Sequence, residues 1–259
     1  MRVVVFFGGN GHAGARLAPA RAVLDGMGSD APFEIIDIPY PGFEGRPSAA
    51  GREAFLDACA GVASRLAARD DVLVYATGIG ALFAVALRAQ RRLAAHPVVL
   101  QGPVLWELER RWMPRLARAG FAPIIPRLFA WPAFQRHFVR RHFVAPLARE
   151  VRSAFFDGYA RCAATADLFR WCHPSWLRDM ERTVARDPGT LDGVEVWWGA
   201  RDRVVGPSEL RWTERAISVR WPERTFAAWG HYPMIDDPEA WVRALAATAV
   251  EGPAVRIDR

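Results

Sequence analysis

The sequence predicts an α/β protein with a mostly parallel sheet covered by helices on both faces. Short apolar runs that suit buried strands alternate with segments of helical periodicity, an order that indicates parallel strands joined by crossover helices. With 259 residues, 51% of them hydrophobic, the chain can bury a large core as one domain, or as one domain with a large insertion. Near residues 71–88 a strand turns through small residues into an Ala- and Leu-rich helix, which is the third indication.

Six apolar runs are expected to be strands: Val3–Phe7, Phe33–Ile38, Val72–Tyr75, Pro97–Gln101, Val194–Trp198 and Thr225–Trp229. Besides the helix that follows the third strand, helical patterns cover Arg16–Met27, about Arg52–Ala68, Ser208–Ser218 and a final stretch that begins near Pro238. The tail Glu251–Arg259 is expected to be loosely held.

The alternation stops between Val104 and about Pro188. This stretch is rich in Trp and Phe, and its prolines divide it into short helices. We therefore expect three parts: a first part of the α/β core at 1–103, a helical cap or lid at 104–188, and a second part of the core at 189–259. Long insertions over such sheets are often functional, although an outer helical layer with no role at the site is the alternative.

The charge of the chain is unevenly spread. All 34 basic residues are Arg, which indicates a GC-rich bacterial genome, and the formal net charge is +6. Residues 106–186 hold 15 Arg against 7 acidic residues, a surplus of +8. No nucleic-acid-binding module accompanies this surplus, so we expect no nucleic-acid partner.

Other classes of protein lack support in the sequence. No segment approaches the ~18–20 uninterrupted apolar residues of a transmembrane helix, and the N-terminus does not have the pattern of a signal peptide. We therefore expect a cytoplasmic protein without a membrane partner. The three cysteines are too few and too scattered for a disulfide framework or a zinc site.

The strand–helix turn reads Ala76-Thr77-Gly78-Ile79-Gly80. This is the small-x-nucleophile-x-small pattern of a nucleophile elbow, with Gly78 at the position of the nucleophile. Taking Thr77 as the nucleophile fails, because Tyr75 and Ile79 would then occupy the positions that must be small. The alternative is an ordinary glycine-containing turn of a doubly wound sheet, including one that binds phosphate.

Two later turns complete a pattern. Gly199-x-x-Asp202-x-x-Val205 follows the penultimate strand, and Gly230-His231 precedes a helix that begins with proline. Together with the early glycine loop, the elbow and the lid, these turns resemble the α/β-hydrolase superfamily in the correct order along nearly the whole chain. The start of the chain and the turn at 41–46 are similar to compact thioesterase-like members.

The resemblance implies roles for particular residues. Asp202 matches the acid that orients the histidine, and His231 matches the general base. The backbone N–H of Ile79 matches one donor of the oxyanion hole, and Gly9 or Asn10 would supply the second. Thr77, Trp106 and Tyr232 are further candidates for the substrate pocket.

Gly78 departs from the family pattern and limits the chemistry, because no covalent acyl- or alkyl-enzyme can form without a nucleophile. The first hypothesis is an enzyme in which His231 removes a proton from a largely apolar carbonyl compound, leading to cyclisation, elimination, decarboxylation or C–C cleavage, as in secondary metabolism. A second is a hydrolase of esters or thioesters in which His231 activates water. A third is a non-catalytic protein that binds a ligand or partner.

The ligand is expected to be a small acyl or carbonyl molecule. The Arg surplus favours an anionic handle, such as a carboxylate or a coenzyme A phosphate, or an acidic carrier protein, although a solvated Arg-rich face is the alternative. No metal motif is present, and we expect no cofactor. Residues 9–14 do fit Gly-x-Gly-x-x-Gly with Asp37 as the following acid, but a nicotinamide site would leave the elbow, the acid turn and the histidine turn unexplained.

Overall fold

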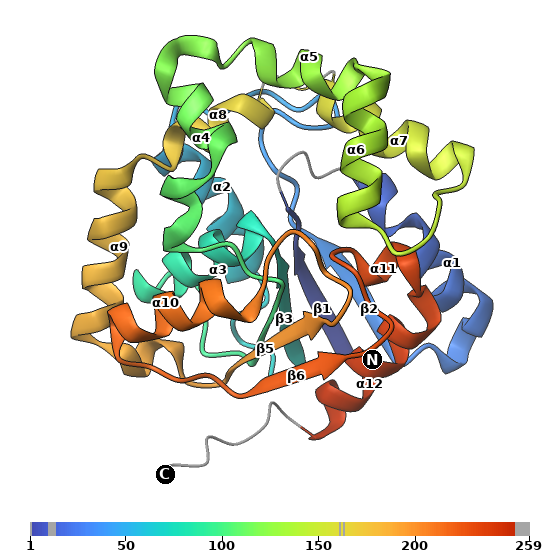
Figure 1. Ribbon diagram of the computed structural model, residues 1–259. Helices are drawn as coiled ribbons and strands as arrows, with labels where there is room; N and C mark the ends of the chain where they lie inside the picture. Colours follow the sequence, from blue (N-terminus) through green and yellow to red (C-terminus); the bar gives the residue numbers. More distant parts are fainter. Residues whose placement is uncertain (1, 10–13, 161, 163, 252–259) are drawn as a thin grey trace.

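The computed structural model describes residues 2–9, 14–160, 162 and 164–251 (Figure 1). Six parallel strands form one sheet in the order β2-β1-β3-β4-β5-β6. The strands are β1 (Arg2–Phe7), β2 (Phe33–Asp37), β3 (Val72–Thr77), β4 (Val98–Gln101), β5 (Val194–Gly199) and β6 (Glu223–Phe226). The prediction of an α/β fold with a mostly parallel sheet is therefore confirmed.

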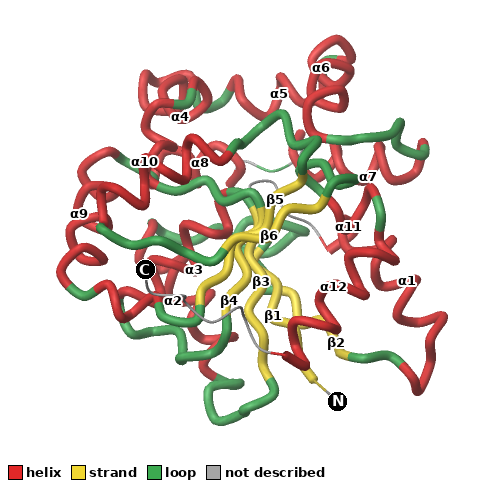
Figure 2. Tube along the Cα trace, turned by 60° about the horizontal axis from the view of Figure 1, so that its bottom comes forward, coloured by secondary structure: helices red, strands yellow, loops and turns green. Residues whose placement is uncertain are grey.

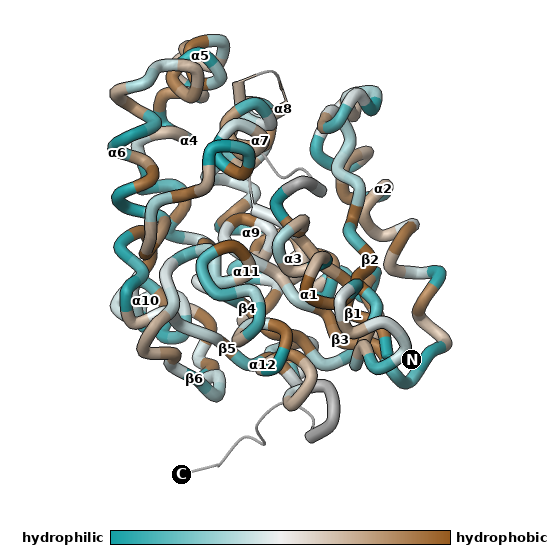
Figure 3. Tube along the Cα trace, turned by 90° about the vertical axis from the view of Figure 1, so that its right-hand side faces the viewer, coloured by the Kyte–Doolittle hydropathy of each residue, from teal (hydrophilic) through white to brown (hydrophobic). Residues whose placement is uncertain are grey.

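Helices cover both faces of the sheet (Figure 2). One face carries α1 (Ala18–Met27) and α12 (Pro238–Glu251), and the other carries α2 (Arg52–Ser64), α3 (Ile79–Ala89) and α10 (Pro207–Ile217). The central strands β1 and β3 are apolar along almost their whole length, as Figure 3 shows by colour, because both of their faces are buried under these helices.

Some predicted bounds were wrong. The last strand was expected at Thr225–Trp229 but lies at Glu223–Phe226, where its residues pair with β5 from Val196 to Gly199. Trp229 lies in the following turn. Its ring is buried there and stacks on that of Phe226, with ring centres 3.6 Å apart. Helix α2 ends at Ser64, four residues before the expected end at Ala68.

The chain between β4 and β5 is helical, and we call residues 104–188 the cap. It contains α4 (Trp112–Leu116), α5 (Ile124–Ala130), α6 (Pro132–His142), α7 (Arg149–Ala160), α8 (Ala164–Trp171) and α9 (Pro174–Arg186). Helices α4 to α8 lie over the carboxyl ends of the strands, and α9 runs back along the side of the sheet (Figure 1). The division into separate core and cap domains at residues 103 and 188 stays a prediction.

Arg88 fixes the place where the chain returns from the cap to the sheet. Arg88 lies at the end of α3, and the residue is 7% exposed. It donates to four backbone carbonyls, those of Ala94 and His96 before β4 and those of Thr190 and Asp192 before β5, at 2.7–3.0 Å. Because charged donors make strong hydrogen bonds, this one side chain holds both segments against α3.

Most of the tail predicted to be loosely held, residues 252–259, lies outside the described residues. Within the described residues, no helix combines the length and apolarity needed to cross a bilayer.

Candidate active site

The turn between β3 and α3 places Gly78 at the carboxyl end of the sheet. Its φ of 55° and ψ of −126° lie in a region that glycine adopts readily and other residues adopt with strain. A Cβ built on Gly78 would lie 3.6 Å from Nε2 of His231 and 3.9 Å from Cα of Gly9. The position therefore has room for a small side chain, and that side chain would face the imidazole.

Gly80 explains why the elbow needs small residues. A Cβ on Gly80 would lie 2.3 Å from the carbonyl oxygen of Gly8 and 2.5 Å from that of Phe7. Helix α3 therefore starts in direct contact with the end of β1, and nothing larger than glycine fits there. This close packing brings the loop that contains Gly9 beside Gly78.

Asp202 and His231 form a buried pair. Asp202 lies in the turn after β5 and His231 in the turn after β6, and Nδ1 of His231 lies 2.8 Å from Oδ2 of Asp202. Their side chains are 1% and 5% exposed. The two residues that the sequence assigns as acid and base are therefore brought into contact across adjacent turns.

The second carboxylate oxygen holds Asp202 in its turn. Oδ1 accepts hydrogen bonds from the N–H groups of Val204 and Val205 at 2.7 and 3.1 Å. Burial alone would raise the pKa of Asp202, but the neighbouring His231 and these N–H groups outweigh it and lower that pKa below its ordinary value. Since the carboxylate accepts a hydrogen bond from Nδ1–H, the opposite nitrogen, Nε2, keeps its lone pair toward Gly78.

Gly102, which follows β4, packs closely against the Asp202–His231 pair. Its φ is 47°, and a Cβ at this position would lie 3.0 Å from Oδ2 of Asp202 and 3.2 Å from Nδ1 of His231. The hydrogen bond between acid and base therefore rests directly on the backbone at residue 102.

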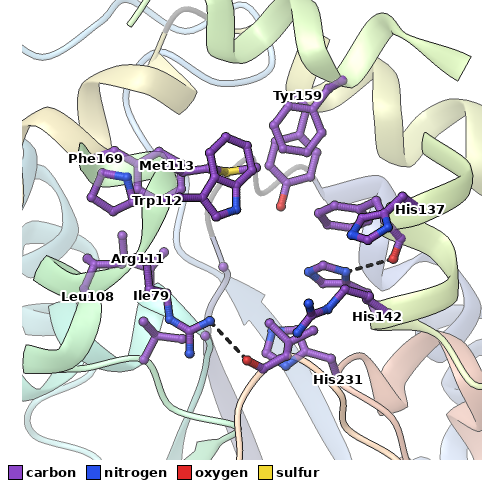
Figure 4. A pocket seen from close by; sticks show the side chains of 18 of the residues that line it. Ile79, Leu108, Arg111, Trp112, Met113, His137, His142, Tyr159, Phe169 and His231 are labelled. Atoms are coloured by element: carbon purple, nitrogen blue, oxygen red, sulfur yellow. Dashed lines mark hydrogen bonds between the residues drawn. The ribbon is translucent and has the colours of Figure 1, made fainter. Parts of the chain in front are cut away.

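A cavity of about 470 Å³ lies between the cap and the turns at the carboxyl ends of the strands (Figure 4). We call the side formed by these turns the floor. From the floor it is lined by Gly9, Gly78, Ile79, Val204, His231 and Tyr232. The cap contributes mainly aromatic and aliphatic side chains, including Trp112, Met113, Phe129, Phe134, Phe138 and Phe169. An apolar cavity with a few convergent polar groups is typical of a small-molecule site.

The remaining predicted pocket residues divide into three groups. Tyr232 lines the cavity, whereas Thr77 and Trp106 do not. Both are buried in the core, 2% and 1% exposed, and Leu108, two residues after Trp106, faces the cavity instead. Asn10, the alternative second donor of the oxyanion hole, lies outside the described residues.

Ile79 is well placed to donate a hydrogen bond into the cavity. It is the first residue of α3, and the first N–H groups of a helix have no acceptor within the helix. The positive end of the helix dipole adds to the attraction for a negative oxygen. A carbonyl oxygen near Gly78 would meet this N–H.

His142, at the end of α6, is a residue that the sequence analysis missed. It lines the cavity, and its ring centre lies 5.6 Å from that of His231. Its own carbonyl oxygen accepts the N–H of His231 at 3.2 Å. Loss of solvation and the nearby His231 lower the pKa of His142 well below its usual value. Residues 142 and 231 are far apart in the sequence, and no local motif around His142 marks it as part of a site.

Three arginines line the same cavity: Arg110, Arg111 and Arg141. Arg111 pairs with Glu209 at 2.7 Å and donates to the carbonyl of Val204. Arg141 donates to the carbonyl of Arg203 at 2.6 Å. No carboxylate is among the described side chains that line the cavity, so its polar lining is basic. Among the described residues, no group of three His, Cys, Asp or Glu is arranged to hold a metal ion.

Known proteins resemble this chain in structure rather than in sequence. No protein-family model matches it, and no curated protein matches it. A loop variant of a haloalkane dehalogenase from Bradyrhizobium elkanii superposes with a TM-score of 0.71 and 17% identity, covering 96% of this chain and 89% of the dehalogenase. A bromoperoxidase from Bacillus anthracis gives a TM-score of 0.70 and 15% identity, covering 96% of this chain and 92% of the bromoperoxidase. The chain therefore has the α/β-hydrolase fold.

Proposed function

We propose that the protein is an enzyme that uses His231 as a general base on a carbonyl compound and forms no covalent intermediate. The observation that carries this proposal is Gly78. The acid and base keep the 2.8 Å contact of a working pair, while the residue that Nε2 faces has no side chain. The absence of a side chain at Gly78 argues against covalent catalysis at the elbow and leaves proton abstraction by His231 available.

The reaction begins with a hydrogen on the carbon next to the carbonyl group. Nε2 of His231 takes the proton, the electrons of the C–H bond form a carbon–carbon double bond, and the π electrons of the carbonyl group move to its oxygen to give an enolate. The N–H of Ile79, with that of Gly9 as its partner, stabilises the negative oxygen. Asp202 holds the ring in the required tautomer and stabilises the imidazolium.

Several outcomes follow from an enolate. It can close a ring or expel a leaving group, and decarboxylation and C–C cleavage generate the same enolate from other bonds. All of them draw on the same donors at the oxyanion position. The aromatic walls of the cavity favour a largely apolar substrate, such as a polyketide-like or fatty-acyl intermediate of secondary metabolism.

The basic lining supports an anionic handle on that substrate. Arg110, Arg111 and Arg141 lie on the cap side of the cavity, where a carboxylate or phosphate on the substrate would meet them. The same surplus of arginine in the cap would attract an acidic carrier protein that delivers the substrate.

A pre-steady-state assay with an activated acyl ester tests the proposed site. The Gly78→Ser variant should show a burst of released alcohol, because the new hydroxyl would lie against Nε2 of His231. The Gly78→Ser/His231→Ala double variant should lose that burst. If a folded Gly78→Ser variant gives no burst, the base and the donors are not competent, and a non-catalytic ligand-binding protein becomes the better hypothesis.

Hydrolysis by activated water is a second candidate, and one observation favours it. The space at Gly78, 3.6 Å from Nε2 at the Cβ position, has room for a water beside the base. General-base catalysis alone contributes roughly 10²–10⁴-fold, so this route needs an activated ester or thioester. Incorporation of labelled oxygen from water into the wild-type product would favour hydrolysis, and its absence would favour enolate chemistry.

A further inference from the structure

His142 presents one defined ring nitrogen to the cavity. Its Nδ1 lies 2.8 Å from the carbonyl oxygen of Phe138, one helical turn earlier in α6. A carbonyl oxygen only accepts hydrogen bonds, so Nδ1 must carry the proton and donate. Nε2, at the other side of the ring, is then an unprotonated acceptor, and the ring projects toward the cavity in Figure 4.

The ring of His142 is held firmly in this orientation. It stacks on Phe138 with ring centres 3.5 Å apart and planes 5° apart, and it lies nearly parallel to Tyr232 at 6.0 Å. The backbone carbonyl of His142 also binds the N–H of His231. The two histidines are therefore fixed relative to each other by stacking and by the main chain.

The surroundings keep His142 neutral. Desolvation of the buried ring lowers the pKa of His142 most, and the nearby His231 and Arg141 act in the same direction. The carbonyl of Phe138 and the carboxylate of Asp202 act in the opposite sense and do not outweigh them. A neutral imidazole with a bare Nε2 attracts hydrogen-bond donors and has little attraction for anions.

The polar groups of the cavity therefore define a pattern that a substrate must match. The N–H of Ile79 requires an acceptor, which the carbonyl oxygen supplies in the proposed function. Nε2 of His231 faces the proton to be removed, whereas Nε2 of His142 requires a donor of its own. Within the described residues, no protein hydrogen bond is found at that nitrogen.

We infer that Nε2 of His142 binds a hydroxyl group of the substrate, so that the substrate class is a hydroxy-carbonyl compound. The carbonyl lies at Ile79 and Gly78, and the hydroxyl lies toward α6, at His142. The ring centre of His142 is 5.6 Å from that of His231. This inference rests on the proposed function, because it takes the carbonyl position from it. His142 acts by binding and orienting the substrate and takes no part in a covalent step.

Proton–nitrogen NMR of the imidazole rings tests the acceptor directly. At about pH 7, His142 should give the signals of a neutral ring that is protonated on Nδ1. His142→Phe identifies these signals by removing them. A ring protonated on Nε2, or a doubly protonated ring, would overturn the inference.

A pair of ketone probes tests the substrate class. One probe is benzylacetone, and the other is its analogue with a hydroxyl on the benzylic carbon. Wild type should bind the hydroxylated probe about three- to tenfold more tightly, the ratio expected for one neutral hydrogen bond. Binding can be followed by tryptophan fluorescence, because Trp112 lines the cavity.

Variants of α6 separate hydrogen bonding from packing. His142→Phe keeps an aromatic ring between Phe138 and Tyr232 but should remove the preference for the hydroxyl. His142→Gln, which can again offer an acceptor, should restore part of the preference. His173→Asn changes a histidine outside the cavity lining, at the N-terminal cap of α9, where Asn can still accept the N–H of Ser175, and it should leave the preference as in wild type. A preference that survives in His142→Phe would overturn the inference.

The proposed function has its own readout in the same experiment. Both probes have exchangeable hydrogens next to the carbonyl, and His231→Ala should abolish their enzyme-dependent exchange with deuterated water. Exchange that persists in His231→Ala argues against the proposed base and leaves the hydroxyl preference to be judged separately. Conversely, normal exchange without any hydroxyl preference overturns only the role of His142.

Discussion

The floor of the cavity contains glycines and a hydrogen-bonded acid–base pair, whereas the cap lines the cavity mainly with aromatic and aliphatic side chains and with three arginines. On the floor, Asp202 uses both carboxylate oxygens and His231 is held by its ring and by its main chain. In the cap, Trp112 and Trp131 are 53% and 59% exposed. Figure 3 shows the same contrast, with hydrophilic positions frequent along α6 and apolar positions along β1 and β3. In the proposed function, the floor holds the acid, the base and an oxyanion donor, and the cap lines most of the space that the substrate would fill.

Asp202→Asn should have the largest effect, and it tests the floor alone. Asn can still accept the N–H groups of Val204 and Val205, but its amide would donate to Nδ1 and turn the imidazole into the wrong tautomer. We expect deuterium exchange of benzylacetone to fall by roughly 10²–10⁴-fold with little change in probe binding. An Asn variant that exchanges at the wild-type rate would show that His231 does not depend on its partner.

The next prediction concerns Glu107, which lies where the chain passes from β4 into the cap, and the pH dependence of stability. Burial raises the pKa of this carboxyl to about 7, although the N–H of Leu105 stabilises the charged form. The unfolded chain gives up this proton near pH 4.5, so the folded state binds more protons between about pH 4.5 and 7. We expect the free energy of unfolding to fall by about 3 kcal/mol as the pH rises through this window.

Urea unfolding at the two ends of the window measures this effect. Glu107→Gln removes the titrating group, so the fall should be smaller in the variant than in wild type. Equal pH dependence in the two proteins would contradict the assignment.

Gly102→Ala tests how closely the acid–base pair is seated. The new Cβ would press on both members of the pair, at 3.0 and 3.2 Å, and the positive φ adds about 1–3 kcal/mol of strain. We expect about tenfold slower exchange together with lower stability.

Gly120→Ala is the matched control for this change. Gly120 lies in the cap with a φ of 91°, and its Cβ would meet no atom within 4 Å. It should lower stability through strain and leave exchange nearly unchanged. Equal loss of exchange in both variants would mean that strain alone, rather than contact with the pair, explains the result at Gly102.

Arg141→Gln should have the smallest effect, and it tests the cap. Arg141 is exposed, so its attraction for an anion is screened by solvent and salt. We expect about a two- to fivefold loss in the binding of phenylbutyrate at low salt and none for neutral benzylacetone. Phenylbutyrate binding that is indifferent to salt in wild type would argue against an anionic handle.

The sequence predicted the floor better than the cap for a physical reason. Asp202 and His231 lie in short turns after strands, and parallel strands bring the ends of such turns to one edge of the sheet. The position of Gly78 was predicted in the same way, because it lies in the turn that directly follows a strand. His142, by contrast, reaches the site through the folding of several short helices, and no local pattern encodes that path.

The pocket residues show the same limit. Trp106 was a candidate for the pocket, but the short helical turn at Trp106–Arg110 directs it into the core and Leu108 toward the cavity. Trp229 was assigned to the last strand because it is apolar, although a turn can bury such a ring equally well. Side-chain direction in irregular segments depends on tertiary packing, and a single sequence carries little information about it.

The anchorage by Arg88 has a consequence for how such a protein can diversify. The guanidinium ties the returning chain at Thr190 and Asp192 to the helix behind the elbow, at the end of α3 away from Gly78. The chain that re-enters the sheet is thus held by contacts that do not involve the cavity. A different cap joined between Gly102 and Thr190 would keep this anchorage, but it would also have to supply the main-chain carbonyl that accepts the N–H of His231, which here belongs to His142. A change of substrate by exchange of the cap would therefore need only this one contact with the acid–base pair to be preserved.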